Sequence, residues 1–452
     1  MGHYVTSADI PVDGEKLTHP KVGILKTVFG IATIVGVIAG ICIWLFGSDK
    51  IAGSYSYSYL YGFTFFLTLS IGGCFWTLLH NVSNSGWGTS VRRVFENLGA
   101  VYPYMFLLVI PFFFPGVQKY LWEWMAVHKE AASGADVSMT AGAAFGFWGN
   151  DEFKLALFDM HEAILAGKLW YLNLTSWNVR LVFYFAALGG VILHMRNLSV
   201  KQDTDPKPGV LNLFKARAHA SWGLPIFGVC LTFWAIDFIM VLDYKWFSTM
   251  WGVYFFAGCA MSSMATIILT TLILRKAGYL KNVVTVEHDH IMGKLNFAFV
   301  VFWAYVTFSQ FFLYWYANVT EETSYYLLRN TEGWNTVSII LVFGHFAFPF
   351  LMLIRQDLKK NAKYMMVTTI YLLSIHALDV YHMIIPERGP SLSLINHMDN
   401  INLWLGGVWY LDILGFLTIG SGFMFFYLRN LTSVALYPHR DPRILESANV
   451  HN

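Results

Sequence analysis

The residues best suited to chemistry lie in one apolar stretch, YLLSIHALDVYHMIIP, at positions 371–386. His376, Asp379 and His382 follow one another at three-residue steps, so a helix would place them on one side. A carboxylate between two imidazoles can hold and pass a proton, because the surroundings can move the pKa of histidine across neutrality. The same residues could instead form a satisfied hydrogen-bond cluster that ties helices together.

Other ionisable side chains lie in equally apolar stretches. Asp237 ends the sequence WAID, as Asp379 ends HALD, and Asp412 is a single acid with no obvious partner. Pro349 follows His345 by four residues and should kink a helix and free a backbone carbonyl. Such a kink suits a polar cavity and suits ordinary helix packing equally. Because a charge in hydrocarbon is costly and usually functional, all of these groups are candidates for proton transfer.

A third set lies where apolar stretches begin. Glu96 follows Arg92 and Arg93, and the sequence VEHDHIMGKLN contains His288 and Asp289. These groups could form the inner mouths of proton half-channels, or they could be helix-end charges that reach the interface. We favour proton uptake for Glu96 and His288, and interfacial charges for the arginines.

The elements that position these residues are apolar helices. Hydrophobic residues make up 56% of the 452 residues and charged residues 13%, against about 25% charged in a soluble domain. Ten stretches could each cross a bilayer core of about 30 Å, and they predict an all-α polytopic membrane protein. We place them at 27–47, 56–80, 98–115 (starting earlier, near Thr89), 179–197, 221–242, 250–274, 295–317, 335–354, 364–386 and 402–428. The net charge of +2 and the scattered basic residues give no indication of nucleic-acid binding.

The connections between spans alternate in charge. Loops 2–3, 4–5, 6–7 and 8–9 are rich in Lys and Arg, whereas the opposite loops carry more acids, so both termini should be cytoplasmic. The polar first twenty residues show no secretory signal, and the first span should remain as a helix. Loop 116–176 is predicted outside, with amphipathic pieces that suit either the interface or docking of an external subunit.

A weak internal repeat indicates duplication. Trp177-Asn178 and Trp334-Asn335 begin equivalent spans 157 residues apart (334 − 177), and WAID and HALD follow in the same order. We therefore expect two four-helix bundles that point the same way, as in some transport proteins. The predicted division is a cytoplasmic segment 1–22, a first transmembrane helix 23–55, a first bundle 56–243, a second bundle 244–386, a last transmembrane helix 387–430 and a cytoplasmic tail 431–452.

The chain resembles a known family at three of these stretches. FSQFFLYWYANVTEE, GHFAFPFLMLIRQDLKK and SIHALDVYHMIIP together resemble the NrfD and polysulfide-reductase membrane-subunit family. More narrowly, they resemble its branch in alternative complex III, a bacterial quinol:cytochrome c oxidoreductase. The length and the C-terminal YPHRDPRILES run are similar to the F-type subunits of that branch. The resemblance covers roughly residues 25–445.

The resemblance implies a paired-bundle subunit of a respiratory electron-transport complex in the bacterial cytoplasmic (inner) membrane. It implies no metal or haem in the chain itself, with quinone or menaquinone as a candidate ligand. The expected partners are a homologous NrfD-like sibling, an external iron–sulfur subunit, multihaem c-type cytochromes, lipids and, as a further candidate, a terminal oxidase. Proton half-channels would use Asp237, His376, Asp379 and His382 toward the outside, His345 in the middle, and Glu96, His288 and Asp289 toward the inside.

Three other classes stay open. A secondary transporter would fit the parallel repeat and the buried acids. A b-type cytochrome would need two histidines at one depth on facing helices, which His345 and His376 could supply. A purely structural anchor would leave every buried charge paired and inert. The cysteines (Cys42, Cys74, Cys230 and Cys259) form no C-x-x-C motif, so covalent haem and iron–sulfur ligation are not expected, and helix packing is their predicted role.

Overall fold

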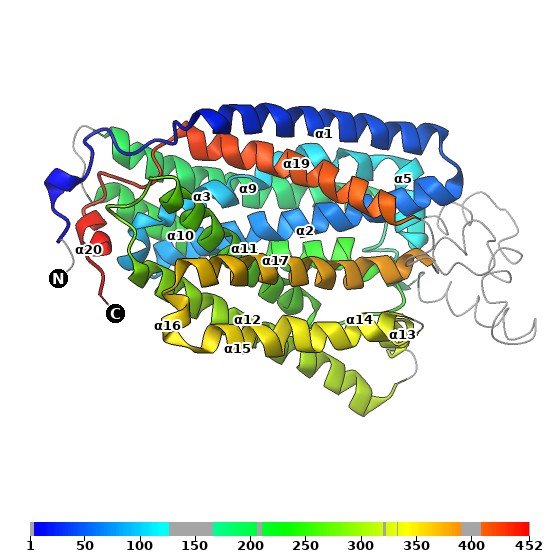
Figure 1. Cartoon of the computed structure of the whole chain (residues 1–452). Helices are drawn as coiled ribbons and strands as arrows, with labels where there is room; N and C mark the ends of the chain where they lie inside the picture. The colour runs from blue at the N-terminus through cyan, green and yellow to red at the C-terminus, as the bar shows by residue number, and fades with distance from the viewer. Residues whose placement is uncertain are drawn as a thin grey trace, which may run out of the picture.

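The computed structural model describes residues 4–125, 165, 167–205, 210–319, 322–331, 333–389 and 408–451. Within these ranges the chain is helical and contains no β-strand, and ten of its helical segments are long and apolar enough to cross a membrane. The helices lie side by side, with both chain termini at one end of the molecule, which we call the terminal end (Figure 1). The prediction of an all-α polytopic membrane fold is therefore confirmed.

Every predicted span corresponds to one observed segment, in the same order. Six segments are single helices: Pro20–Phe46 (α1), Asp49–Val82 (α2), Leu174–Thr204 (α9), Trp251–Lys276 (α11), Val286–Ala317 (α12) and Trp409–Ser433 (α19). Three others are Arg92–Phe113, which contains α3 (Arg92–Gly99) and α4 (Tyr102–Val109), Leu211–Asp243, which contains α10 (Leu211–Phe238), and Ala362–Glu387, which contains α17 (Ala362–Ile384). The segment Trp334–Ile354 consists of α14 (Trp334–Leu341), a π-helix η5 (Val342–Ala347) and α15 (Phe348–Ile354). Short helices α5 (Pro115–Leu121), α13 (Ser324–Leu328), α16 (Gln356–Lys359) and α20 (Ile444–Ala448) lie between or after them. Most of the observed helices extend beyond the predicted apolar cores, because polar residues at their ends continue the helix, whereas the third segment ends earlier than predicted, at Phe113.

α2 and α11 form the centre of the molecule. α2 packs against α3, α10, α11 and α19, and α11 packs against α2, α10, α12 and α17. The two central helices approach closely at Gly72, where a Cβ atom would lie 2.1 Å from the carbonyl oxygen of Cys259. Small residues at such contacts are the usual means of packing helices in a membrane. One group of helices (α2, α3, α4, α9 and α10) thus adjoins a second group (α11, α12, α15 and α17), while α1 lies outside against α19.

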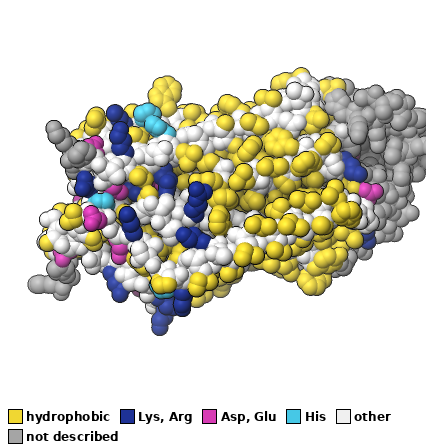
Figure 2. Space-filling view, turned by 90° about the horizontal axis from the view of Figure 1, so that it is seen from above, with side chains coloured by type: hydrophobic (Ala, Val, Ile, Leu, Met, Phe, Trp, Pro, Cys, Tyr) yellow, Lys and Arg dark blue, Asp and Glu magenta, His cyan; other side chains and the backbone are white. Residues whose placement is uncertain are grey.

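The surface has the polarity expected of a multi-pass membrane protein. Hydrophobic side chains form a broad band over the body of the molecule, and charged side chains gather toward the terminal end (Figure 2). Most of α1 is exposed, including Cys42, so the packing role predicted for that cysteine is wrong; Cys74, Cys230 and Cys259 are buried as expected. Most of loop 116–176 lies outside the described residues, including 126–130 of the first amphipathic piece and most of the second, 151–172. In the described part of the first piece Trp122 and Trp124 are buried within the chain, so these two side chains do not face the membrane interface.

At the terminal end the two chain ends pack on each other and on the helix ends. Lys16 forms an isolated β-bridge with Ala435, and the Leu436 N–H donates to the Glu15 carbonyl at 2.8 Å. Ser447 of α20 lies 2.8 Å from Ser90, before α3. The C-terminal segment 435–449, which we call the tail, therefore forms part of the packed structure at this end.

Candidate functional site

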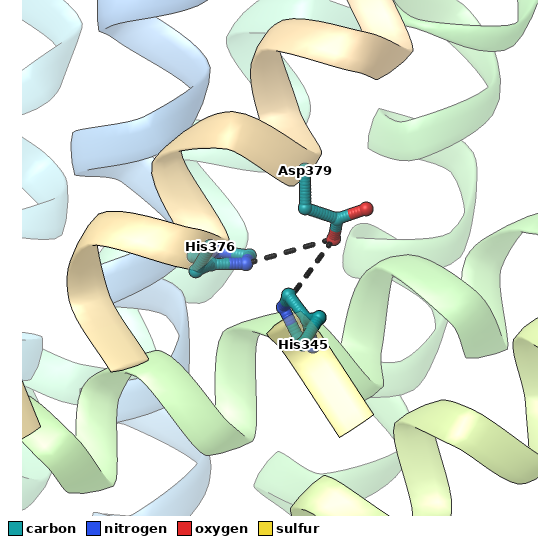
Figure 3. Close-up of side chains that lie close together, drawn as sticks. All are labelled: His345, His376 and Asp379. Atoms are coloured by element: carbon teal, nitrogen blue, oxygen red, sulfur yellow. Dashed lines mark ion pairs between the residues drawn. The ribbon is translucent and has the colours of Figure 1, made fainter. Parts of the chain in front are cut away.

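His345, His376 and Asp379 meet inside the second group of helices, and we call them the triad (Figure 3). His376 and Asp379 lie one turn apart on α17, and His345 lies on the π-helix η5. Asp379 Oδ2 is 3.7 Å from His376 Nδ1 and 3.9 Å from His345 Nε2. All three side chains are buried. The structure thus places a carboxylate between two imidazoles.

The predicted kink at Pro349 takes the form of the π-helix. The Phe348 N–H donates to the Phe343 carbonyl, five residues back, so the helix is widened where His345 projects. Insertions of this kind are rare and are frequent at functional sites. On the other side, Gly258 of α11 faces His376, and a Cβ atom there would lie 2.7 Å from His376 Cε1. A side chain larger than hydrogen at this position would displace the imidazole.

Neighbouring helices hold the triad in place. The Tyr254 hydroxyl donates to Asp379 Oδ1 at 2.5 Å, and the Trp303 indole N–H donates to Oδ2 at 3.2 Å. The Trp303 ring also stacks on His345, with ring centroids 3.7 Å apart. Thr68 Oγ1 of α2 lies 3.1 Å from His376 Nε2. Helices α2, α11 and α12 therefore each contribute one or more contacts that orient the triad.

Three nitrogen atoms of the triad remain available. Neither ring nitrogen of His345, nor Nδ1 of His376, has a hydrogen-bond partner among the described residues. Buried polar atoms are nearly always paired with protein or ordered water, so each such atom calls for an explanation. Two of these nitrogens, His345 Nε2 and His376 Nδ1, face the Asp379 carboxylate and can accept or release a proton with little rearrangement. This is the arrangement that acid–base chemistry requires.

His382 does not take the role that its spacing predicted. Its Nε2 lies 3.0 Å from Ser338 Oγ of α14, and the second imidazole beside Asp379 is His345 from another helix. His382 follows His376 by six residues, which is well short of two full turns of 3.6 residues. The two side chains therefore point in different directions around the helix. The sequence pattern thus identified the acid and one histidine, and it named the wrong second histidine.

Asp237, its counterpart in the first group of helices, is a paired charge. Arg180 of α9 binds it with two hydrogen bonds, Nε to Oδ2 at 2.8 Å and Nη2 to Oδ1 at 3.0 Å. The Tyr184 hydroxyl donates to Oδ2 at 2.7 Å, and the Trp177 indole donates to the Asp237 carbonyl. A two-point pair of this kind is strong and directional. Asp237 therefore has a permanent countercharge, whereas no Lys or Arg of the described residues pairs with Asp379.

The sequence repeat explains this difference. Arg180 precedes Val337 by 157 residues, and Leu188 precedes His345 by the same interval. In WAID and HALD, Trp234 stands where the other copy has His376. The first copy thus places an arginine and a tyrosine beside its acid. The second places two histidines beside its acid, together with the donors Tyr254 and Trp303. The two halves share their acid and differ in the groups that could exchange protons with it.

Asp412 also has partners, contrary to the prediction. The Arg388 guanidinium donates to Oδ1 at 2.8 Å, Ser58 donates to the same oxygen at 2.6 Å, and the Tyr381 hydroxyl donates to Oδ2 at 3.0 Å. Arg388 comes after the apolar part of its span and so has no recognisable link to Asp412 in the sequence. The contact joins α19 to α2 and to the end of the span that contains α17.

The charges at the terminal end form a buried network. Glu96 accepts ion pairs from Arg92 at 3.2 Å and Arg93 at 3.1 Å, and these arginines also pair with Asp441 of the tail and with Asp203, each at 2.8 Å. Arg92, Arg93, Glu96 and Asp441 are all buried. The prediction that the two arginines lie at the interface is therefore wrong. Glu96 is thereby held by two cations.

His288 and Asp289 differ in how completely their side-chain atoms are engaged in hydrogen bonds and ion pairs. Nδ1 of His288 accepts the Thr285 N–H at 3.0 Å in a capping box, and its Nε2 lies 3.3 Å from Ser447. Asp289 pairs through Oδ2 with Arg275 at 2.5 Å, while its Oδ1 has no partner in the described part of the chain. His288 thus caps a helix, whereas Asp289 forms an ion pair and keeps one carboxylate oxygen unpaired among the described residues.

The triad could also hold a metal ion by distance alone. One ligand atom from each of its residues lies within 4.8 Å of the others, and two histidines with one carboxylate are a known donor set for transition metals. However, both Asp379 oxygens already accept hydrogen bonds from Tyr254 and Trp303. This pattern of donors favours a carboxylate that exchanges protons.

Several contributors to these sites were missed in the sequence. Arg180, Arg388, Tyr254 and Trp303 each contact one of the predicted acids. Tyrosine and tryptophan are so frequent here that their types alone carry no signal. Arg180 could have been considered, because it is the second residue of the predicted span 179–197, and a charge at the start of an apolar span needs either the interface or a buried partner.

Comparisons with known proteins add no assignment. No family model matches the sequence, and a search of curated proteins finds no match.

Proposed function

We propose that this chain is the integral membrane subunit of a quinol:cytochrome c oxidoreductase of the alternative complex III type, in a bacterial cytoplasmic membrane, and that its triad transfers protons. Quinol oxidation releases electrons and protons, which must leave by different routes. In this proposal the electrons pass to iron–sulfur clusters and c-type haems in external partner subunits. Titratable groups within the membrane carry further protons across it during turnover, so that proton uptake on one side accompanies proton release on the other.

The triad is the observation that carries the proposal. His345, His376 and Asp379 are buried at the junction of the central helices and keep three unpartnered nitrogens among the described residues. A proton accepted by an imidazole here remains beside a carboxylate, which stabilises the resulting cation. The same carboxylate receives fixed donors from Tyr254 and Trp303, so it can return to the anionic form after the proton leaves.

The sequence resemblance supplies the rest of the proposal: the quinone or menaquinone substrate, the homologous sibling subunit and the cytochrome partners. The terminal end is proposed to face the cytoplasm, because the loops rich in Lys and Arg lie on the side of the termini. Electrons would then leave at the opposite end. Asp237 and Asp412 are given structural roles in this scheme, since arginines neutralise both.

The test is to replace Asp379 by Asn and His376 by Gln in the complete complex, reconstituted in lipid vesicles. Quinol turnover and proton release are measured together with a pH-sensitive dye. We expect turnover-linked proton transfer to fall by about 100-fold, the scale of a lost acid–base group, while the complex still assembles. Asp357→Asn and His219→Gln are matched controls at exposed positions and should behave like the unmodified protein.

A purely structural anchor is the second candidate, because the ion pairs of Asp237 and Asp412 show that this chain does use buried charges to join helices. The same experiment separates the two. Unchanged turnover and unchanged proton release in Asp379→Asn, with normal assembly, would support the anchor and overturn proton transfer by the triad.

A further inference from the structure

One buried face of α12 carries polar groups at seven-residue steps. Asp289, Asn296, Trp303 and Gln310 are each separated by seven residues, and all four side chains are buried. Seven residues are close to two helical turns, so these side chains lie in a row along the helix. Each step covers about 10.5 Å at 1.5 Å per residue. The row runs from the terminal end, past the triad, toward the opposite end.

The row contains polar atoms that the described protein residues leave unpaired. Both the amide oxygen and the amide nitrogen of Asn296 are buried without a hydrogen-bond partner, and Asn296 is 0% exposed. Oδ1 of Asp289 is unpaired in the same sense. An amide buried in hydrocarbon without any partner is costly. Internal water is the usual partner of such groups, and a water needs several polar neighbours to be held.

The row meets the triad at Trp303. Its indole N–H donates to Asp379 Oδ2, the oxygen that also faces both histidines. α12 and α17 are parallel segments in contact, so the residues of α12 before Trp303 lie on the terminal-end side of the triad. Asn296 therefore lies between Asp289 and the triad along the helix axis.

We infer that this face of α12 is the path by which protons reach the triad from the terminal end, with Asp289 at its mouth and Asn296 as the group that positions water in the middle. The inference rests on the proposed function of the triad and specifies its inner half-channel. Asn296 can both donate to and accept from water, so it can orient a hydrogen-bonded chain without changing its own charge. A gap of about 10.5 Å on either side corresponds to roughly three waters at about 2.8 Å spacing.

The other groups at the terminal end are less available for this role. Glu96 is paired with two arginines, and Nδ1 of His288 accepts a backbone hydrogen in a helix cap. Asp289 keeps one carboxylate oxygen unpaired while Arg275 holds the other. Of the three inner candidates from the sequence, Asp289 alone lies in the row with Asn296.

The test uses Asn296→Leu in the complete complex in vesicles, with proton uptake measured in the compartment at the terminal end during quinol turnover. Leu has the same branching and the same number of side-chain heavy atoms as Asn and lacks its polar atoms, so the loss of an unpartnered buried amide should leave the unfolding temperature equal or higher. We expect proton uptake from that side to slow by at least about tenfold. Asn296→Asp, which restores a polar group of the same size, should recover uptake. Met292→Leu is the matched control, a buried apolar change on the same face.

Two results would overturn the inference. Normal proton uptake in Asn296→Leu, while Asp379→Asn blocks transfer, would leave the triad intact as the proton site and reject this path to it. Slow uptake that Asn296→Asp does not restore, with a lowered unfolding temperature, would assign Asn296 a structural role. If Asp379→Asn also leaves uptake normal, the proposed function itself fails, and the two failures are thus distinguishable.

Discussion

Asp237 and Asp379 come from the two copies of one sequence repeat, and their partners give them different chemistry. Arg180 holds a permanent positive charge and contacts both oxygens of Asp237. His345 and His376 can each be neutral or charged, and they lie beside Asp379 without a fixed hydrogen bond to it. An acid with a permanent partner stays charged, and the fold is destabilised when that partner is removed, whereas an acid beside histidines can exchange protons.

The pairing of Asp237 leads to a stability prediction. Arg180→Met should lower the free energy of unfolding by about 3 kcal/mol, because it leaves the Asp237 carboxylate buried without a countercharge. Arg180→Met combined with Asp237→Leu should recover most of this loss, since both members of the pair become apolar. Thermal unfolding in detergent measures both effects. Proton release should be unchanged in the double variant, and a loss of proton release there at normal stability would return Asp237 to the proton path.

Among the helical elements, the π-helix Val342–Ala347 sets the position of His345. Pro349 lacks a backbone N–H and therefore disfavours regular α-helical hydrogen bonding in the turn before it. Pro349→Ala should let this turn relax toward an α-helix, which would rotate His345 away from Asp379.

For Pro349→Ala we expect proton transfer to fall by about tenfold or more while the unfolding temperature stays the same or rises. Solution or crystal structures of the variant would show whether the His345–Asp379 separation of 3.9 Å has increased. Full activity with an α-helical turn would show that the π-helix is unnecessary for the site.

The tail is the second element whose behaviour can be predicted, because its charges titrate. Burial, assisted by Arg440 and Arg93, holds the pKa of His439 below its usual range despite the nearby Asp203. Burial acts to raise the pKa of Asp441, but Arg92 and Arg443 outweigh it and hold that pKa below its usual value.

Because both pKa values are lowered in the folded protein, both groups make the packed tail less stable as the pH falls. A group whose pKa is lowered by folding stabilises the folded form above its unfolded pKa, and this contribution is lost as the pH falls. The tail should therefore begin to loosen below about pH 6.5 through His439 and further below about pH 3.9 through Asp441. Cleavage of the tail by a protease across this range measures the effect. His439→Gln should abolish the first step, and an unaltered profile in that variant would contradict the assignment.

For the whole molecule, the length of the hydrophobic stretches was sufficient to predict the ten spans and their order. Unpaired backbone N–H and C=O groups are costly in lipid, so an apolar stretch of that length is expected to form a helix. The partners of buried charges were harder to predict. Arg388 directly follows the span Ala362–Glu387, whereas Asp412 lies 24 residues later in α19, so no helical spacing in the sequence links the two. The π-helix was predicted only as a kink, because proline identifies the disturbed turn and leaves its hydrogen-bond pattern open.

The orientation of the molecule in the membrane is the last prediction, and it fixes the direction of proton movement. Both termini lie at one end (Figure 1). The loops rich in Lys and Arg join the spans on that side, so the positive-inside rule predicts that this end faces the cytoplasm. Green fluorescent protein fused after the C-terminal residue should fluoresce, since it folds in the cytoplasm. Alkaline phosphatase inserted after Val319, at the opposite end, should be active, since it folds only outside. The reverse pattern would mean that the row on α12 opens outward, and protons drawn along Asn296 would then come from the external side.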